Sequence, residues 1–317
     1  MDTSGQQRVP IQPQRVDAPL TRSSIFLVLS MVDTDEATQA VKDALGSVAD
    51  LTKNVAIRDL HATLAVAVGV GSRVWDRIMS VPAPAELHPF REFHGEKHTA
   101  IATPGDLLFH IRAERYDLCF EFERQLLDVL GDAVKVSDET VGFRYFDARD
   151  LLGFVDGTAN PVGPDVDAST VVGDEDQQHA GGSYVVVQKY LHDVKAWNSL
   201  PTEAQEAIIG RRKIDNFELD DAVEGQKAHK TLTTIEDDEG EHDILRDNMP
   251  FGTPGTDNFG TYFIGYSRHL WVTERMLERM FIGDPVGKHD RILDFSTPTL
   301  GCTFFVPCAE ALEALGD

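Results

Sequence analysis

Short runs of apolar residues, each followed by a stretch with helical periodicity, recur along the chain. Residues 24–29 (SIFLVL) are typical of a buried strand, and residues 34–51 then repeat their apolar positions with the period of a helix. Residues 183–188 (SYVVVQ) and 201–210 show the same order in the second half of the chain. The pattern predicts a strand followed by a helix near the start of each half.

A closer match between the halves follows further along each of them. Residues 105–115 (GDLLFHIRAER) predict a strand that leads into a helix ending near residue 130. Residues 260–268 (GTYFIGYSR) predict a strand that leads into a helix ending near residue 281. Two copies of one α+β unit explain this order. Antiparallel sheets with helices on one face fit it better than a doubly wound sheet does.

Turn-forming residues mark the organisation of the chain. Residues 156–173 include GTANPVGPDVD and few apolar positions, which indicates a junction between domains. We expect a flexible or draped N-terminal arm over residues 1–22, a first domain over residues 23–160 and a second over residues 161–317. Residues 231–235 (TLTTI) predict an additional strand in the second domain.

Composition and charge narrow the function classes. With 42% hydrophobic and 26% charged residues, the chain is typical of a soluble globular protein. Its formal net charge of −24 argues against nucleic-acid and anionic-membrane partners, although it would attract cationic substrates and metal ions. The N-terminal segment lacks a secretory h-region, and the longest nearly apolar run, residues 63–70, is too short to span a bilayer. We therefore expect a cytoplasmic protein.

Two polar segments interrupt the apolar pattern and carry candidate chemistry. In residues 153–161 (GFVDGTANP), Asp156 stands between glycines, where the backbone can approach a ligand closely; an ordinary Asp-Gly turn is the alternative. In residues 243–252 (DILRDNMPFG), Arg246 and Asn248 form a polar step. The guanidinium of Arg246 suits a bound anion or a developing negative charge, whereas pairing with a neighbouring aspartate is the alternative.

His229 is a candidate metal ligand. It precedes the predicted strand of residues 231–235, and an imidazole at the boundary of an element is a common ligand of haem iron. Because the chain has eleven histidines, the position of His229 alone does not single it out.

Together these segments resemble the dye-decolourising peroxidase family, and the absence of an export signal resembles its cytoplasmic B-type branch. The GFVDGT signature stands at residues 153–158, and RDNMPFG stands at residues 246–252. Three further segments resemble the family: residues 105–113 (GDLLFHIRA), 209–213 (IGRRK) and 290–298 (DRILDFSTP). These ordered matches extend over nearly the whole chain.

The resemblance implies an α+β fold of two ferredoxin-like domains, with antiparallel sheets and peripheral helices, of the dimeric α+β barrel type. It implies one haem b per subunit, bound mainly by the second domain and without a covalent link, since no CxxCH motif occurs. His229 would be the proximal iron ligand, Asp290 (or, less well, Asp294) its carboxylate partner, and Arg211 the contact of a haem propionate. The residues implied on the distal side are Asp156, Gly157, Thr158, Arg246 and Asn248.

The function implied is a peroxidase that reduces hydrogen peroxide through a ferryl state and oxidises dyes, phenolics or Mn²⁺. A carboxylate such as Asp156 can move a proton between the peroxide oxygens, and the guanidinium of Arg246 can stabilise the departing oxygen. A haem-handling protein with little turnover is the alternative, and it would need His229 but neither distal residue. A haem-free oligomerisation module would leave all three unexplained.

The substrate is expected to be a small aromatic or cationic reductant, and large dyes would receive electrons through surface aromatic residues. The candidates are Trp75, Trp197 and Trp271, with Tyr190 and Tyr266 behind them; ordinary packing is the alternative for each. A homo-oligomer is expected because sheets of this class often pair at their edges. Residues 309–317 (AEALEALGD) include no Gly/Ser/Pro-rich tail, so docking in an encapsulin nanocompartment is not expected.

Overall fold

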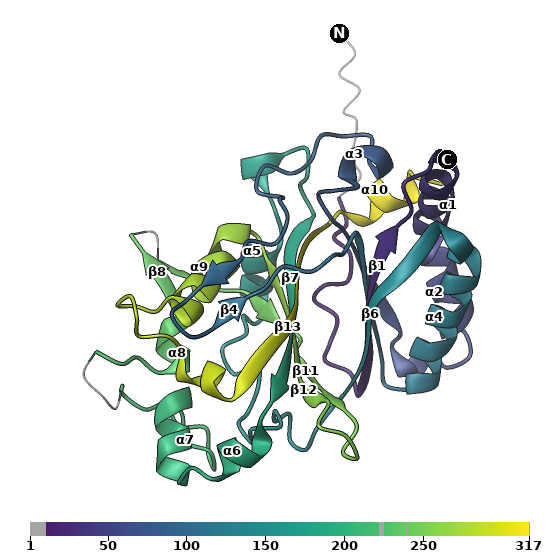
Figure 1. Ribbon diagram of the computed structural model, residues 1–317. Coiled ribbons are helices and arrows are strands. Elements are labelled where there is room, and N and C mark those ends of the chain that lie inside the picture. The colour runs from purple at the N-terminus through teal and green to yellow at the C-terminus, as the bar shows by residue number, and fades with distance from the viewer. Residues whose placement is uncertain (1–10, 222–224, 239, 317) are drawn as a thin grey trace.

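The strands of the N-terminal half form an antiparallel sheet in the order β6-β1-β5-β2 (Figure 1). They span Ser23–Met31 (β1), Ala65–Val70 (β2), Leu107–Ala113 (β5) and Val134–Phe143 (β6). The computed structural model describes residues 11–221, 225–238 and 240–316.

The C-terminal strands form a second antiparallel sheet in the order β11-β12-β7-β13, with β10 also paired to β12. They span Ser183–His192 (β7), Leu245–Arg246 (β10), Met249–Gly252 (β11), Phe259–Ser267 (β12) and Ser296–Val306 (β13). Single bridges join the two sheets at both edges, Phe251 to Gly142 and Phe305 to Val70. The two sheets therefore close into a barrel.

Helices cover the outer faces of the two sheets on opposite sides of the molecule (Figure 1). Beside the N-terminal sheet lie α1 (Asp35–Gly46), α2 (Val48–Ala56) and α4 (Tyr116–Leu130). Beside the C-terminal sheet lie α5 (Pro164–Thr170), α6 (Val194–Asn198), α7 (Thr202–Ile209), α8 (His229–Leu232) and α9 (Leu270–Phe281). Within the described residues, no helix is long and apolar enough to cross a membrane.

Short elements complete the chain. The helical ones are η1 (Leu60–Ala62), α3 (Trp75–Ile78), η2 (Gly131–Ala133), η3 (Asp174–Asp176), η4 (Arg291–Asp294) and α10 (Ala309–Glu313). The extended ones are β3 (Phe93–His94), β4 (Thr99–Ala100), β8 (Ile235–Asp237) and β9 (Gly240–His242), and they pair as β3 with β4 and β8 with β9.

Burial on both faces explains why the strands appear in the sequence as unbroken apolar runs. In β1, Phe26 and Val28 face the barrel, whereas Ile25, Leu27 and Leu29 pack beneath the helices. Each of these side chains is fully buried. Successive side chains of a strand point to opposite faces, so a strand between a barrel core and a helical layer is apolar at every position.

The described part of the N-terminal arm, residues 11–22, lies against the barrel. The side chain of Gln14 is buried, and its Nε2 donates to the carbonyls of Val68 (3.0 Å) and Pro307 (2.9 Å). Its Oε1 accepts the N–H of Val68 at 2.8 Å. Gln14 thus connects β2 to the end of β13, close to one of the single bridges that close the barrel. Residues 1–10 of the predicted arm lie outside the described residues.

Two local predictions were wrong. The helix predicted over residues 34–51 is divided into α1 and α2 at Ser47, whose hydroxyl donates to the carbonyl of Ala44 at 2.9 Å and so competes with the helical pattern. The strand predicted over residues 231–235 begins only at Ile235, because residues 231 and 232 end α8 and residues 233 and 234 connect α8 to β8. There the hydroxyls of Thr233 and Thr234 donate to carbonyls one turn earlier, at 3.0 and 2.9 Å, which outweighs their β propensity.

Candidate active site

A cavity lies between the outer face of the C-terminal sheet and the segments that cover it. Its empty volume is about 990 Å³, including the space at its open mouth. On β7, the lining residues Gln188, Tyr190 and His192 alternate with Val185 and Val187, which face the barrel. The opposite wall includes Met276, Leu277 and Met280 of α9 and Leu293 of η4. An apolar cavity with a few polar groups is typical of a ligand site.

His229 begins α8 and lines this cavity. Its Nδ1 lies 2.6 Å from Oδ2 of Asp290, a fully buried carboxylate whose Oδ1 accepts the N–H of Ile292 at 3.1 Å. Burial works to lower the pKa of His229, but the charge and hydrogen bond of Asp290 outweigh it, so the pKa is raised. In the neutral imidazole, Nδ1–H donates to this carboxylate and the lone pair of Nε2 is left for a ligand.

Asp156, Arg246 and Asn248, the candidate distal residues, line the same cavity. Oδ1 of Asp156 accepts the N–H of Gly157 at 2.7 Å and the side-chain amide of Asn248 at 3.3 Å. The other end of the Asn248 amide, Oδ1, accepts the N–H of Ile264 on β12 at 3.1 Å. The sheet therefore orients Asn248, and Asn248 orients Asp156.

Arg246 combines a fixed backbone with an almost free guanidinium. Its N–H donates to Oδ1 of Asn160 at 3.0 Å, and its carbonyl accepts from Nδ2 of the same residue at 2.7 Å. Its Nη2 makes one long contact, 3.5 Å to the carbonyl of Ala159, and its buried Nε has no partner among the described residues. Burial lowers the pKa of Arg246, whereas the charge of Asp156 opposes this. Unpaired buried donors are costly, so this group fits an oxygen-bearing or anionic ligand.

Arg211 and Thr158 lie beside the cavity, whose lining among the described residues does not include them. Arg211 donates to the carbonyl of Asn216 at 3.4 Å and pairs with Glu218 at 3.5 Å. The amide of Asn216 donates to the hydroxyl of Thr158 at 2.9 Å, which connects the two residues. The charge of Arg211 also contributes to the lowered pKa of Arg246. Arg211 therefore lies at the edge of the site.

A second cavity, with an empty volume of about 450 Å³ including the space at its mouth, reaches Asp156, Arg246 and Asn248 from another side. It is lined by Asp156, Gly157, Arg246 and Asn248, together with residues of the N-terminal arm such as Thr21. Asp156, Arg246 and Asn248 therefore stand between two cavities, and the smaller one offers a small molecule a separate approach to them.

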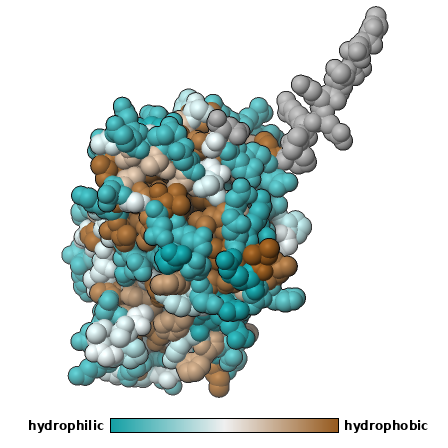
Figure 2. All heavy atoms as spheres, turned by 90° about the vertical axis from the view of Figure 1, so that its right-hand side faces the viewer, coloured by the Kyte–Doolittle hydropathy of each residue, from teal (hydrophilic) through white to brown (hydrophobic). Residues whose placement is uncertain are grey.

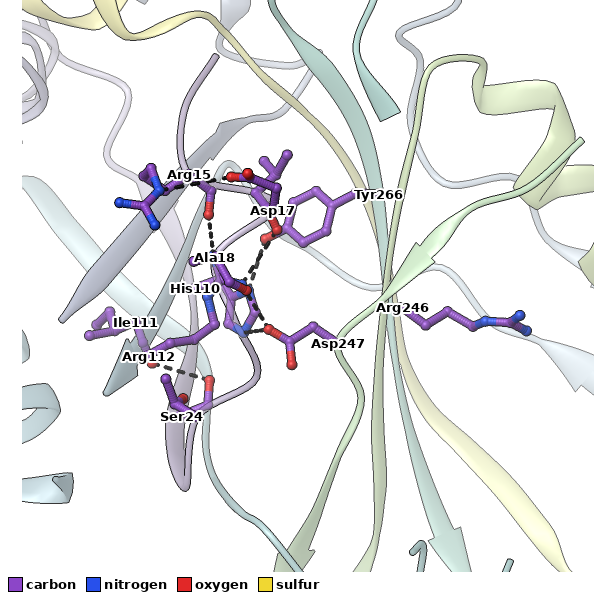
Figure 3. Close-up of polar contacts among 12 residues, drawn as sticks. Arg15, Asp17, Ala18, Ser24, His110, Ile111, Arg112, Arg246, Asp247 and Tyr266 are labelled. Atoms are coloured by element: carbon purple, nitrogen blue, oxygen red, sulfur yellow. Dashed lines mark hydrogen bonds and ion pairs between the residues drawn. The ribbon is translucent and has the colours of Figure 1, made fainter. Parts of the chain in front are cut away.

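A buried polar cluster behind the distal residues was not recognised in the sequence. Arg246 and Asp247 point to opposite sides of the chain, and Nη1 of Arg112 donates to Oδ2 of Asp247 at 2.8 Å inside the barrel (Figure 3). Nδ1 of His110 lies 2.9 Å from the hydroxyl of Tyr266. Burial raises the pKa of Asp247 against the opposing effect of Arg112, and burial holds the pKa of His110 well below its usual range. Asp247 thus pairs with Arg112 and leaves Arg246 free.

The aromatic residues predicted as surface exits for electrons are mostly buried. Trp75 and Trp197 are fully buried, and their indole N–H groups donate to the carbonyls of Val81 and Leu152, each at 2.9 Å. The packing alternative therefore holds for both, because each indole is enclosed in a core, and neither is a surface exit. Tyr190 lines the main cavity, whereas Trp271 is 38% exposed.

Comparison with known proteins identifies the family. The models described as "Dyp-type peroxidase, N-terminal" and "Dyp-type peroxidase, C-terminal" match residues 13–144 and 147–311. This chain belongs to the Dyp-type peroxidase family. It is 53% identical to a dye-decolorizing peroxidase of Rhodococcus erythropolis over 306 residues, which are 96% of this chain and 89% of that protein.

Solved structures agree with this assignment. The DyPB protein of Rhodococcus jostii is 53% identical and superposes with a TM-score of 0.93, over 98% of this chain and 100% of that one. The predicted family, the α+β fold class and the enzyme class are thereby confirmed. An encapsulated DyP-type peroxidase from Mycobacterium smegmatis is also 53% identical, with a TM-score of 0.92 over 97% of this chain and 98% of its own. The expectation that this chain does not dock in a nanocompartment is therefore not supported.

Proposed function

We propose that the main cavity binds one haem b per subunit without a covalent link, and that the chain uses it to reduce hydrogen peroxide and oxidise small aromatic or cationic compounds. One observation carries this proposal: His229, with Nε2 available, and Arg246, with its guanidinium almost unpaired, line the same cavity. Variants of the Rhodococcus jostii protein in complex with heme support it.

The residues present fit this cofactor. Nε2 of His229 would hold the iron, while Asp290 fixes the imidazole from behind. The apolar side chains of Phe263, Met276 and Met280 would enclose the ring, and Arg211 at the edge of the site would meet a propionate. When bound, haem supplies the redox-active iron at which peroxide is cleaved.

The distal residues would perform the proton and charge steps. Asp156, held in place by the amide of Asn248, takes a proton from one peroxide oxygen and returns it to the other. The guanidinium of Arg246 stabilises the negative charge that develops on the departing oxygen. A protein that only handled haem would need neither group, and their convergence on one cavity therefore favours turnover.

For larger reductants, we propose Trp271 as the exit for electrons, because it is the partly exposed tryptophan of the three. Its ring packs edge-on against His242, with 4.8 Å between the centroids. Mn²⁺ is a further candidate reductant, and it is supported by a variant of the Rhodococcus jostii protein in complex with manganese. A cytoplasmic location stays a prediction.

We also propose a homo-oligomer, and the surface of the N-terminal half supports it. Apolar side chains gather in patches on this face, which carries α4 and β6 (Figure 2). The large exposed apolar residues of these two elements are Tyr116, Phe120, Val129, Val136, Val141 and Phe143. Apolar patches on a surface mark interaction sites.

Stopped-flow absorption tests the proposed function. Ferric protein mixed with one equivalent of hydrogen peroxide should show a rapid shift of the Soret band, which a phenol or a cationic dye then reverses. The Arg246→Leu variant should keep its haem but react with peroxide about 10²-fold more slowly, the effect expected when a charge-stabilising donor is removed. A Soret band that ignores peroxide would indicate haem handling, and no Soret band after haem is supplied would exclude both functions.

A further inference from the structure

A second group of potential metal ligands lies outside the cavity, close in the chain to Asp290, the partner of His229. His98, in the turn between β3 and β4, meets His289 and Asp294 at the two ends of η4. Nε2 of His98 and Nε2 of His289 each lie 3.0 Å from the same oxygen of Asp294, and all three ligand atoms lie within 4.8 Å of one another. Segments almost two hundred residues apart thus bring two imidazoles and one carboxylate to one point.

The spacing of these atoms fits a metal ion. At the usual zinc–ligand distances of about 2.0–2.2 Å, ligand atoms at the corners of a tetrahedron lie roughly 3.3 Å apart. Two of the three separations are 3.0 Å and the third, between the two imidazole nitrogens, is at most 4.8 Å, so side-chain rotations of modest size bring the three atoms around one ion. The two histidines are partly buried and Asp294 is exposed, so water can complete the coordination from the open side.

The backbone around the site is fixed independently of the histidines. The N–H of Gly95 donates to the carbonyl of His98 at 3.0 Å, which closes the turn that carries this ligand. A Cβ at Gly95 would lie 1.9 Å from the carbonyl oxygen of Phe281, so this turn packs directly on the end of α9. His98 therefore stands on a preformed turn, which lowers the cost of ordering this ligand around an ion.

We infer that His98, His289 and Asp294 bind a divalent transition-metal ion of the zinc class. Two imidazole nitrogens and one carboxylate oxygen suit zinc, cobalt, nickel or copper, whereas calcium, magnesium and manganese prefer oxygen ligands. The nearby cation of Arg291, whose Nε lies 3.9 Å from the other oxygen of Asp294, weakens the attraction locally. The formal net charge of −24 acts in the opposite direction over the whole molecule.

The position of the site suggests what the ion does. His289 and Asp294 stand on either side of Asp290 in the chain, and Asp290 holds His229. An ion bound to His289 and Asp294 would restrain the segment between them, whose Asp290 sets the orientation of the His229 imidazole. This consequence rests on the proposed haem function, whereas binding of the ion does not.

Calorimetric titration with Zn²⁺ tests the site. The sample is the tag-free, haem-loaded full chain, treated first with a chelator that removes free and weakly bound metal ions but leaves the haem iron. The expected result is one saturable site of micromolar affinity, weakened at least about tenfold in both His98→Ala and His289→Ala. His94→Ala is the matched control, because this exposed histidine lies in β3 and faces Glu92 instead. Zn²⁺ should also raise the melting temperature of the wild type but not that of the two ligand variants.

Absence of saturable binding would overturn the inference, and so would equal affinity in the wild type, His98→Ala and His289→Ala. An unchanged Soret band in each variant shows that the fold is intact. The outcome is separate from that of the proposed function. Zinc binding in a chain that ignores peroxide would leave this site standing, and peroxide turnover without zinc binding would remove it.

Discussion

The two halves of the molecule share one plan, a sheet whose outer face is covered by helices, but they use that face differently. In the N-terminal half, β1 and β5 turn Ile25, Leu27, Phe109 and Ile111 towards the helices. These side chains are fully buried in one apolar cluster with α4. In this half, the outer face of the sheet is part of a packed apolar core that stabilises the fold.

In the C-terminal half, the corresponding face of β7 and β12 carries polar and aromatic residues. Gln188, Tyr190, His192 and Thr261 line the cavity together with α9. These side chains do not fill the space beneath the helices, and the catalytic candidates enter from α8, β10 and the turn at Asp156. One architecture thus yields a packed core or a ligand site, depending on which side chains occupy alternate positions of two strands.

The largest loss of haem binding and turnover is expected from a change at His229, the candidate iron ligand of the C-terminal half. His229→Ala should abolish haem binding and lower peroxidase turnover by more than about a thousandfold, or ~4 kcal/mol in activation free energy. Soret absorbance after haem titration and steady-state turnover measure both. His61→Ala, an exposed histidine of the N-terminal half, is the control. A His229→Ala variant that retained haem and activity would show that another residue holds the iron.

A pair of variants compares a core residue of the N-terminal half with a cavity residue of the C-terminal half. Phe122→Ala removes a fully buried ring of α4 and should lower the free energy of unfolding by about 3–5 kcal/mol without changing haem affinity. Met276→Ala on α9 should cost less than about 2 kcal/mol, because one side already borders the cavity, but it should weaken haem binding. Urea unfolding and haem titration of both variants test this. Equal costs would mean that the halves are packed alike.

The polar cluster inside the barrel belongs to both halves. Arg112→Met leaves Asp247 buried without its charge partner and should cost about 3–5 kcal/mol of unfolding free energy. The double variant Arg112→Met/Asp247→Leu should recover much of this loss, because no isolated charge remains. A double variant as unstable as the single one would show that shape, not charge, determines the role of the pair.

A smaller effect, on the pH dependence of stability, is expected from Asp150. Its carboxyl lines the cavity and accepts the N–H of Phe154 at 2.9 Å. Burial raises its pKa from 3.8 to about 7 in the folded protein. Between about pH 4 and 7 the unfolded chain loses this proton while the folded chain keeps it, so stability should fall as pH rises through this window. Asp150→Asn should flatten that part of the profile in urea unfolding. Parallel profiles for variant and wild type would contradict the assignment.

Much of the fold could be predicted because local patterns encode it: the strand runs of β1, β5, β7 and β12 alternate with helical periods. The candidate site residues came from the resemblance of the GFVDGT and RDNMPFG segments to the family, and Asp156, Arg246 and Asn248 of these segments meet in one cavity. Long-range features could not be predicted in this way. Closure of the barrel depends on single bridges and on Gln14, and the pairing of Arg112 with Asp247 joins residues 135 apart in the chain.

Two further differences between the predicted and the observed structure concern the threonines after His229 and the buried tryptophans. The threonines at residues 233 and 234 have β propensity, but their hydroxyls bond back to the preceding turn and keep it helical around His229. Trp75 and Trp197 are large and amphipathic, so sequence alone cannot decide between a surface and a core position. Burial of both follows from helix packing, which no local pattern encodes.

A crystal structure of the haem-loaded protein shows directly which residue holds the iron. We expect iron bonded to Nε2 of His229, with Asp290 on Nδ1 and with Asp156 and Arg246 on the opposite side of the ring. Iron held by a different residue, or haem bound outside the cavity beneath α9, would contradict it.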